Sequence, residues 1–390
     1  MKKIQRNCLT ATLLMGMMFL AAIFTLQGAL LTSLISHYSV AESVQGFASS
    51  AASVGGVVAL VSSFFLIGKL SKLLLLRLSV ATCAVFLALL KVSPVYAVFV
   101  AMWFALGVGM GYLDMLVSSC MADLYEGRAA TRMMCILHTS YGIVSSIVPV
   151  VYSKILASGT QWNNIYLYVA AAGALLLILF TLAMRFARSG LQAEPTAEQR
   201  LSFRDMRKIL SKGVLPALVC AMFCQGVYLG GFNTWIDRYV SITLSSKLGS
   251  LSLSLMFFGV MLSRLTLAFA PIPPVKYIRY AGVASGLFLL AALPFKNGAI
   301  MCAGVFLSGA CFGAFIPCTL DVGCALTPES SMFATTAMML AVYLGQAVAP
   351  PVIGALGAAF NLHAGILFCI AFTFLCSLFC RFAKLPDDMR

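Results

Sequence analysis

The sequence predicts an all-α polytopic membrane protein whose twelve transmembrane helices form two six-helix halves. Composition is the first reason: 61% of the 390 residues are hydrophobic, 10% are charged, and the mean hydropathy is +0.99. A water-soluble domain keeps roughly a quarter of its residues charged, so this chain has too few charges to cover a core. The second reason is that apolar runs of about 18 residues or more recur along the chain, each long enough for a helix to cross a hydrocarbon layer of about 30 Å.

The runs are continuously apolar and do not alternate every second residue, which favours helices over a β-barrel. From the N-terminus, the expected spans are 9–34, 43–68, 73–92, 95–121, 132–155, 162–186, 213–236, 248–270, 276–294, 297–325, 331–357 and 361–382. Arg77 interrupts the third, and Lys276 and Arg279 open the ninth. No small-residue cleavage site follows the first run, which is also too long for a signal-peptide core, so we expect it to be retained.

Positive charge is distributed unevenly over the loops. Lys and Arg number 26 against 12 Asp and Glu, a net charge of +14. Twenty of the basic residues fall on the side of the termini and five on the other, with Arg264 inside a span. This is the positive-inside bias. We therefore expect a multi-pass protein of the cytoplasmic (inner) membrane with both termini cytoplasmic, and the charge does not predict binding to nucleic acid.

The cysteines and the polar loops predict neither a metal site nor an enzyme. Nearly all of the 13 cysteines fall within the spans, without a Cys-x-x-Cys pair or a Cys/His cluster. Such cysteines behave as small buried hydrophobes. No nucleophile–base pair or phosphate-binding loop occurs outside the spans. We expect no cofactor, no metal and no enzymatic activity.

The longest polar stretch separates two halves of six spans. The N-terminal half covers 1–186, a cytoplasmic linker covers 187–212, and the C-terminal half covers 213–390. A shift of 202 residues superposes identical residues of the two halves: Gly107 on Gly309, Gly111 on Gly313, Tyr141 on Tyr343, Pro149 on Pro351 and Val150 on Val352. Two such halves fit the parallel repeats of one large transporter fold.

With these features, the whole chain resembles the major facilitator superfamily. Between spans two and three, "GKLSKLLLLR" (68–77) resembles the family's Gly-x-x-x-Asp-Arg-x-Gly-Arg-Arg loop. Gly68 matches, Lys72 stands where the acid belongs, and Arg77 takes the terminal basic position. The family uses this loop to latch its cytoplasmic gate, so Lys72 implies an altered latch.

A narrower resemblance is to the fucose-permease-like branch. "GVGMGYLDMLVSS" (107–119) is similar to its Gly-rich-Leu-acid element in span four, and "ILHTSYGIVSSIVP" (136–149) to its His-x-x-x-Gly run in span five. "FFGVMLSRLTLA" resembles its Gly-Arg element, with Ser263 before Arg264, and "GAFIPCTLD" and "YLGQAVAPPVIG" fit spans ten and eleven. The resemblance implies proton-coupled sugar symport. Sugar symporters of the branch carry an acid in span one, where this chain has Gln27, which argues against fucose itself.

One face of the fourth span carries Asp114. Trp103, Gly107, Gly111, Asp114 and Ser118 follow one another at intervals of four, four, three and four residues, so they share a helix face. The glycines let a neighbouring helix approach closely. A carboxylate facing lipid costs about 2.5–3.5 kcal/mol or more, so this face points into the bundle. Asp114 either holds span four to a neighbour or, because a dry cavity favours protonation, binds a proton and a hydroxylated solute.

Other polar residues within the spans are candidates to line the same cavity. His138 in span five either bonds a neighbouring helix or titrates together with Asp114. Amides at this depth need partners, whereas an aromatic stripe is also explained by packing. The candidate substrate-binding residues are Gln27, Trp103, Asp114, Ser118, His138, Gln225, Tyr228, Asn233, Trp235, Tyr343 and Gln346, with Asp114 and His138 as the proton-coupling pair.

Charged residues at span ends are candidate gate residues: Arg77, Asp123, Arg264 and Asp321. Asp123 is placed to meet Arg77 or Lys72, and Arg264 to meet Asp321. Solvation at the membrane interface explains each of them equally well.

Three functions remain open. The first is proton-coupled uptake of a small polar solute, a sugar or sugar derivative, by alternating access in a monomer within the lipid bilayer. The second is drug/proton antiport, although Trp103 stands where those exporters carry an arginine before Gly107, and Val148 replaces the glycine before Pro149. The third is a transporter-like sensor or a lipid-handling protein.

Overall fold

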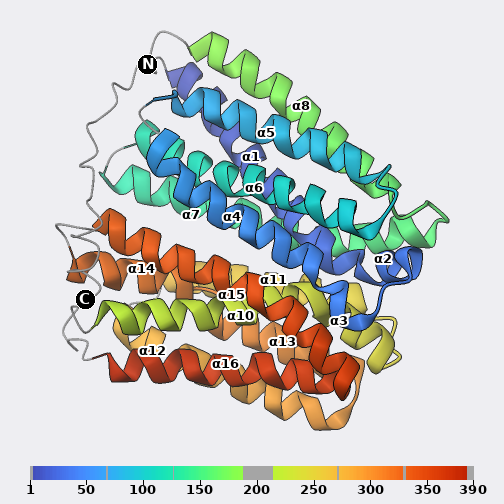
Figure 1. Ribbon diagram of the computed structural model, residues 1–390. Coiled ribbons are helices and arrows are strands. Elements are labelled where there is room, and N and C mark those ends of the chain that lie inside the picture. Colours follow the sequence, from blue (N-terminus) through green and yellow to red (C-terminus); the bar gives the residue numbers. More distant parts are fainter. Residues whose placement is uncertain are drawn as a thin grey trace. The chain divides into compact units, whose positions relative to one another are not determined.

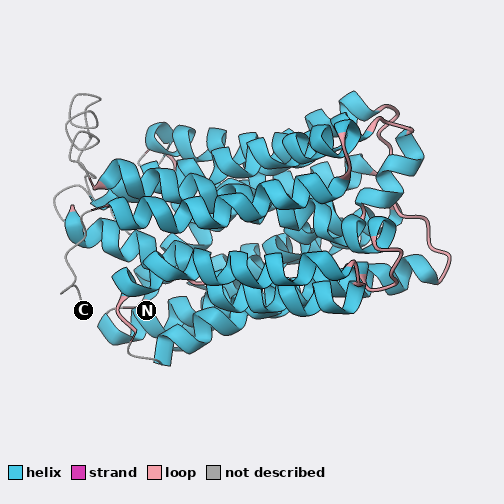
Figure 2. Cartoon of the chain, turned by 90° about the horizontal axis from the view of Figure 1, so that it is seen from below, coloured by secondary structure: helices cyan, strands magenta, loops and turns pink. Residues whose placement is uncertain are grey.

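The computed structural model describes residues 3–66, 69–125, 127–187, 214–269, 272–327 and 331–383 (Figure 1). Nearly all of these residues are helical (Figure 2). The first eight helices are α1 (Lys3–Ala29), α2 (Leu31–Tyr38), α3 (Glu42–Gln45), α4 (Phe47–Leu66), α5 (Lys72–Leu90), α6 (Tyr96–Leu124), α7 (Gly127–Ala157) and α8 (Asn164–Ala187). The others are α10 (Leu215–Arg238), a π-helical turn (Tyr239–Thr243), α11 (Gly249–Phe269), α12 (Pro274–Ala292), a 3-10 turn (Leu293–Phe295), α13 (Gly298–Phe312), α14 (Phe315–Leu326), α15 (Ser331–Ala359) and α16 (Leu362–Phe382).

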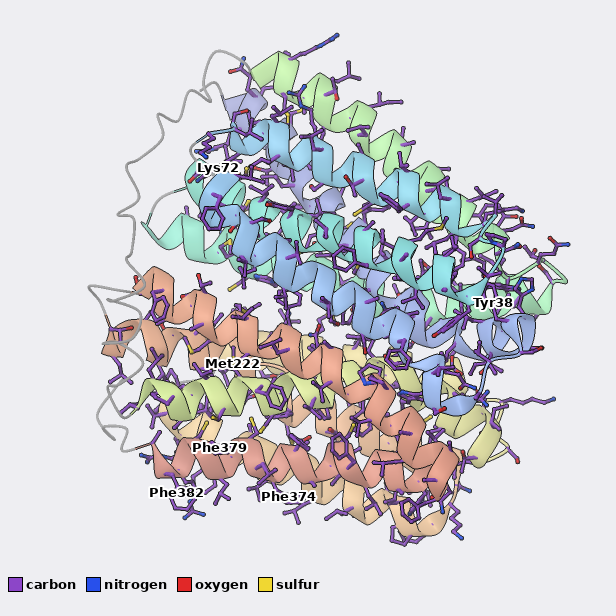
Figure 3. The ribbon with its side chains drawn as sticks, in the orientation of Figure 1. Tyr38, Lys72, Met222, Phe374, Phe379 and Phe382 are labelled. Atoms are coloured by element: carbon purple, nitrogen blue, oxygen red, sulfur yellow. The ribbon has the colours of Figure 1, made fainter. Side chains whose placement is uncertain are left out.

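The described residues contain twelve helical segments long and apolar enough to cross a membrane, which confirms the predicted count. Arg77 lies inside α5 without interrupting it, and Lys276 and Arg279 lie near the start of α12. Large apolar side chains project from the helix surfaces, among them Ile178, 57% exposed, and Phe382 on α16, 72% exposed (Figure 3). Such side chains suit contact with lipid.

Three spans differ from the uninterrupted helices that the sequence predicts. The first span ends at Ala29, and the chain continues as α2. The seventh ends in the π-helical turn Tyr239–Thr243, where the Leu244 amide bonds the Tyr239 carbonyl. The tenth consists of α13 and α14, separated at Gly313 and Ala314. Hydropathy does not report such breaks, because the residues on both sides of each break are equally apolar.

Two compact units make up the chain. Unit 1 comprises Met1–Leu26 and Ala51–Gln199, and unit 2 comprises Gln27–Ser50 and Arg200–Arg390. The segment Gln27–Ser50 therefore groups with the second unit, whereas the sequence assigns it to the N-terminal half. The expected linker, 187–212, lies outside the described residues except for Ala187.

In unit 1, α6 packs against α5 and α7, and α5 also packs against α8. Glycines bring α6 against α4. A Cβ atom added at Gly107 would lie 2.0 Å from the Ala52 carbonyl oxygen, and one added at Gly111 would lie 2.8 Å from the Ala59 Cβ. A side chain at either glycine would separate the two helices. The predicted close approach of a neighbouring helix to this face is confirmed, and the neighbour is α4.

In unit 2, α10 packs against α15 and α16, and α11 against α13. The contact between α11 and α13 repeats the one between α4 and α6. A Cβ at Gly309 would lie 2.4 Å from the Met256 carbonyl oxygen, and one at Gly313 would lie 2.4 Å from the Val260 Cα. Gly309 and Gly313 are the residues that the 202-residue shift superposes on Gly107 and Gly111. The internal repeat therefore has a physical basis, since the same glycines serve the same helix contact in each unit.

Side chains of α11 and α12 stabilise the break between α13 and α14. The Tyr277 hydroxyl donates to the Cys311 carbonyl over 2.7 Å, and the Ser263 hydroxyl oxygen accepts the Ala314 amide over 3.2 Å. Arg264 Nε donates to the Gly313 carbonyl over 3.2 Å. Backbone groups freed inside a membrane need such partners, so Ser263 and Arg264 have a structural use at this break.

Candidate transport site

Asp114 and Ser118 lie on the α6 face that packs on α4, and both side chains are half-buried. Asp114 is therefore not sealed between the two helices. His138, on the neighbouring helix α7, is also half-buried. Unit 1 thus presents a carboxylic acid and an imidazole on adjacent helices, each with part of its surface accessible. Carboxylic acids and imidazoles are group types found in proton relays within membranes.

Trp103 shares the α6 face of Asp114 but lies in an aromatic cluster. Its ring is 1% exposed, with the Phe99 centroid at 6.2 Å and that of Tyr166, on α8, at 6.3 Å. The ring therefore anchors α6 to α8. Its Nε1 is buried and has no hydrogen-bond partner among the described residues, so one donor remains available.

In unit 2, four buried polar side chains lie on α10 and α15, two helices that pack against each other. Gln225 is 3% exposed, Asn233 and Thr234 are 1% exposed, and Gln346 is 7% exposed. We call these four residues the amide layer. The two helices approach through glycine: a Cβ at Gly230 would lie 2.7 Å from the Gln346 Cα. The close approach places Gln346 beside the part of α10 that leads to Asn233 and Thr234, whereas Gln225 lies about 12 Å earlier along that helix.

The amide layer contains polar atoms that the protein leaves unbonded. Within the described residues, Gln225 Oε1 and Thr234 Oγ1 are buried and without a hydrogen-bond partner. Leaving a buried polar group unpaired costs about 1–3 kcal/mol, so such a group calls for an explanation. Gln225 and Thr234 are nine residues apart on α10, about 13 Å along the helix, so a solute hydroxyl can pair with one of the two atoms but not with both.

Two residues expected to bind substrate, Tyr228 and Trp235, form hydrogen bonds to other helices of unit 2. The Tyr228 hydroxyl lies 2.8 Å from the Ser308 hydroxyl, which is in turn 2.6 Å from the Ser285 hydroxyl, and all three residues are buried. Trp235 Nε1 donates to the Pro350 carbonyl over 3.0 Å. The aromatic stripe of α10 therefore ties that helix to α12, α13 and α15, as packing alone would explain.

The remaining substrate candidates, Gln27 and Tyr343, are half-buried, Gln27 near the end of α1 and Tyr343 on α15. Both belong to unit 2, as does the amide layer. Sequence reasoning missed Thr234 and also Asp237, which accepts a hydrogen bond from the Ser241 hydroxyl over 2.9 Å. A scan for polar residues within the spans would have found Thr234, whereas Asp237 lies one residue beyond the expected span 213–236.

Of the gate candidates, Asp123 forms an ion pair. Lys72 Nζ lies 3.0 Å from Asp123 Oδ2, joining the start of α5 to the end of α6 (Lys72 is labelled in Figure 3). Both side chains are about one-third exposed, at 30% and 37%. Lys72 occupies the position where the family's loop has an acid, and here it pairs with the acid Asp123. Arg77 Nε is buried without a partner among the described residues, and Asp321 is exposed.

Comparison with known proteins identifies the family to which this fold belongs. The sequence profile of the Major Facilitator Superfamily matches residues 12–322. Two structures of a bacterial homolog of the human lysosomal transporter Spinster, inward-facing, have a similar fold. The unoccupied one is 12% identical, with a TM-score of 0.74 and 98% of each chain covered. The occupied one is 12% identical, with a TM-score of 0.73, 99% of this chain and 97% of that chain covered.

Comparison with curated protein sequences gives no significant match. At this identity, the two structures bear on the fold alone. The family match covers most of the chain and agrees with the twelve spans and the repeated glycine contacts. The chain therefore belongs to the Major Facilitator Superfamily and is a membrane transporter, not an enzyme.

Proposed function

We propose that the protein moves a small hydroxylated solute, a sugar or sugar derivative, together with a proton by alternating access. The observation that carries the proposal is the buried Gln225 Oε1, which has no partner among the described residues. An acceptor kept unpaired inside a membrane protein suits a ligand that brings a donor. Amide and hydroxyl groups favour a neutral polar solute over a lipophilic cation, so symport is preferred to drug antiport.

Asp114 is the proposed proton site. It is half-buried on α6, and the glycines one and two turns before it hold α4 close. A carboxylate at membrane depth is costly while charged, so it gains a proton on the more acidic side and releases it where water enters. His138 on α7 is proposed to share this proton. We further propose that a monomer contains the whole path of the solute and the proton.

The first test is a thermal-unfolding screen of the purified transporter with sugars, amino acids, nucleosides and lipophilic cations at two pH values. A ligand at a hundredfold its dissociation constant stabilises the native state by about 2.7 kcal/mol. We expect a sugar-class compound to stabilise the protein in a pH-dependent manner. Stabilisation by lipophilic cations alone would instead indicate an exporter.

The second test compares Asp114→Asn with Asp237→Asn in proteoliposomes. Asp114→Asn should abolish accumulation driven by a proton gradient and leave exchange without a gradient. Asp237→Asn is the matched control, because Ser241 already bonds that carboxylate near the end of span seven and an amide oxygen accepts the same bond. Accumulation that persists in Asp114→Asn would remove Asp114 from the coupling role.

A further inference from the structure

Two adjacent prolines shape α15 beside the amide layer. Pro350 and Pro351 lie inside this helix. Proline has no N–H, so each one removes the hydrogen bond to the carbonyl four residues earlier. The carbonyls deprived of their helical donors are those of Gln346 and Ala347. A carbonyl freed within a membrane-spanning helix is satisfied by a neighbouring side chain or lines a cavity.

A side chain from the beginning of the second span satisfies one of these carbonyls. The Ser50 hydroxyl on α4 donates to the Ala347 carbonyl oxygen over 2.5 Å, and Ser50 is 8% exposed. On another helix, Trp235 Nε1 donates to the Pro350 carbonyl. The part of α15 that contains the two prolines is therefore held by a donor from α4 and a donor from α10. Both bonds lie within unit 2.

The backbone fit at Gly46 and Gly28 admits no side chain. A Cβ at Gly46 would lie 2.3 Å from the Pro350 carbonyl carbon and 2.6 Å from the Pro351 nitrogen. A Cβ at Gly28 would lie 2.0 Å from the Asn233 carbonyl oxygen. Backbone thus meets backbone at both ends of the segment Gln27–Ser50. We call this contact of Gln27–Ser50 with α10 and α15 the proline seat.

The proline seat lies on a defined side of the membrane. Twelve spans place both termini on one side, so the segment between the first and second spans lies on the other. Gln346 of the amide layer directly precedes Ala347, and Asn233 is itself part of the seat. Span seven runs from the side of the termini to the other side, so Asn233 and the seat lie about 12 Å beyond Gln225, on the side away from the termini.

We propose that Ser50 is a positioning residue that closes the transport path on the side away from the termini, by bonding the carbonyl that Pro351 frees. The bond forms when that side is closed and breaks when it opens. The inference rests on the proposed function only in taking the amide layer as part of the path. It does not depend on the solute or on proton coupling.

The test measures access to Gln225→Cys from the side away from the termini, with a membrane-impermeant maleimide in proteoliposomes of known orientation. Ser50→Ala is compared with Ser50→Thr, which keeps a hydroxyl. Ser63→Ala is the matched control, because Ser63 is also buried on α4 and, among the described residues, donates to the Leu60 carbonyl of its own helix. The same variants without the added cysteine give the background from native thiols.

We expect Ser50→Ala to raise the labelling rate about threefold to tenfold, the range that the loss of one neutral hydrogen bond gives. Ser50→Thr and Ser63→Ala should label at the unmodified rate. Gly46→Ala provides a second route, since its Cβ would force the seat apart, and it should raise the rate further. Equal rates in Ser50→Ala and Ser63→Ala, with no increase in Gly46→Ala, would overturn the proposal while leaving proton coupling through Asp114 untouched.

Discussion

At the scale of single residues, hydrogen bonding separates structural side chains from candidate binding groups better than burial does. Tyr228 and Gln225 are both almost fully buried on α10. The Tyr228 hydroxyl is bonded to Ser308, whereas Gln225 Oε1 has no partner among the described residues. The sequence did not distinguish the two residues. It shows that each has a polar side chain on α10, but not whether another helix supplies a hydrogen-bond partner.

Replacing Gln225 with methionine tests this distinction, because the expected sign differs between the two roles. Methionine has a similar size and no strong acceptor, so losing an unpaired oxygen should leave the empty transporter as stable or more stable, by up to about 1–3 kcal/mol. The solute should bind roughly tenfold more weakly, which corresponds to about 1.4 kcal/mol. Thermal unfolding with and without the screened solute measures both quantities.

Ser308→Ala is the control for that experiment. It breaks the buried bonds to Tyr228 and Ser285, so it should destabilise the protein by about 1 kcal/mol and leave solute affinity unchanged. If Gln225→Met destabilises the empty protein as Ser308→Ala does, Gln225 holds helices together and is not a binding group.

At the scale of helices, the sequence predicted the twelve spans and the glycine-rich face of α6, because hydropathy and small-residue spacing directly reflect lipid contact and helix approach. It did not predict the break between α13 and α14. That break depends on Ser263, Arg264 and Tyr277, which come from other helices and offer bonds to the freed backbone. The grouping of Gln27–Ser50 with unit 2 was also beyond prediction, since it rests on backbone contacts at Gly28 and Gly46.

The repeated glycine contacts give a prediction at this scale. Gly107→Ala places a Cβ 2.0 Å from the Ala52 carbonyl, and Gly309→Ala places one 2.4 Å from the Met256 carbonyl. Overpacking of this kind costs typically 1–3 kcal/mol, more than the roughly 0.5–1 kcal/mol that alanine gains over glycine in a helix. We expect both variants to lower the free energy of unfolding by similar amounts.

Gly16→Ala on α1 is the comparison, because its added Cβ would meet only side-chain atoms, the nearest at 3.2 Å. Side chains can move by that small amount, so this variant should be neutral or slightly stabilising. Suppose that Gly107→Ala behaved like Gly16→Ala while Gly309→Ala did not. The two helix contacts would then contribute differently to stability, which contradicts the expectation of similar losses.

At the scale of the whole molecule, the distribution of charge predicts how the protein is oriented in the membrane, and the packing of the helices divides the chain into two units. The split of basic residues, twenty on the side of the termini and five on the other, predicts that both termini are cytoplasmic. Each basic residue near an anionic leaflet contributes about 1 kcal/mol, so an excess of this size favours the cytoplasmic side for the termini. With that orientation, the proline seat of Gln27–Ser50 is predicted to lie on the outer side, since the segment lies across the membrane from the termini.

Reporter fusions measure this orientation. A phosphatase that is active only outside the cytoplasm should be inactive after Arg390 and active when inserted between α7 and α8 at Gly159, where nothing lies within 4 Å of an added Cβ. A fluorescent protein that matures only in the cytoplasm should show the reverse pattern. An active phosphatase at Arg390 would invert the molecule: Ser50 would then close the cytoplasmic side, and the Lys72–Asp123 ion pair would lie outside. The direction of transport would not change, because in the proposed symport the solute follows the proton down its gradient in either orientation.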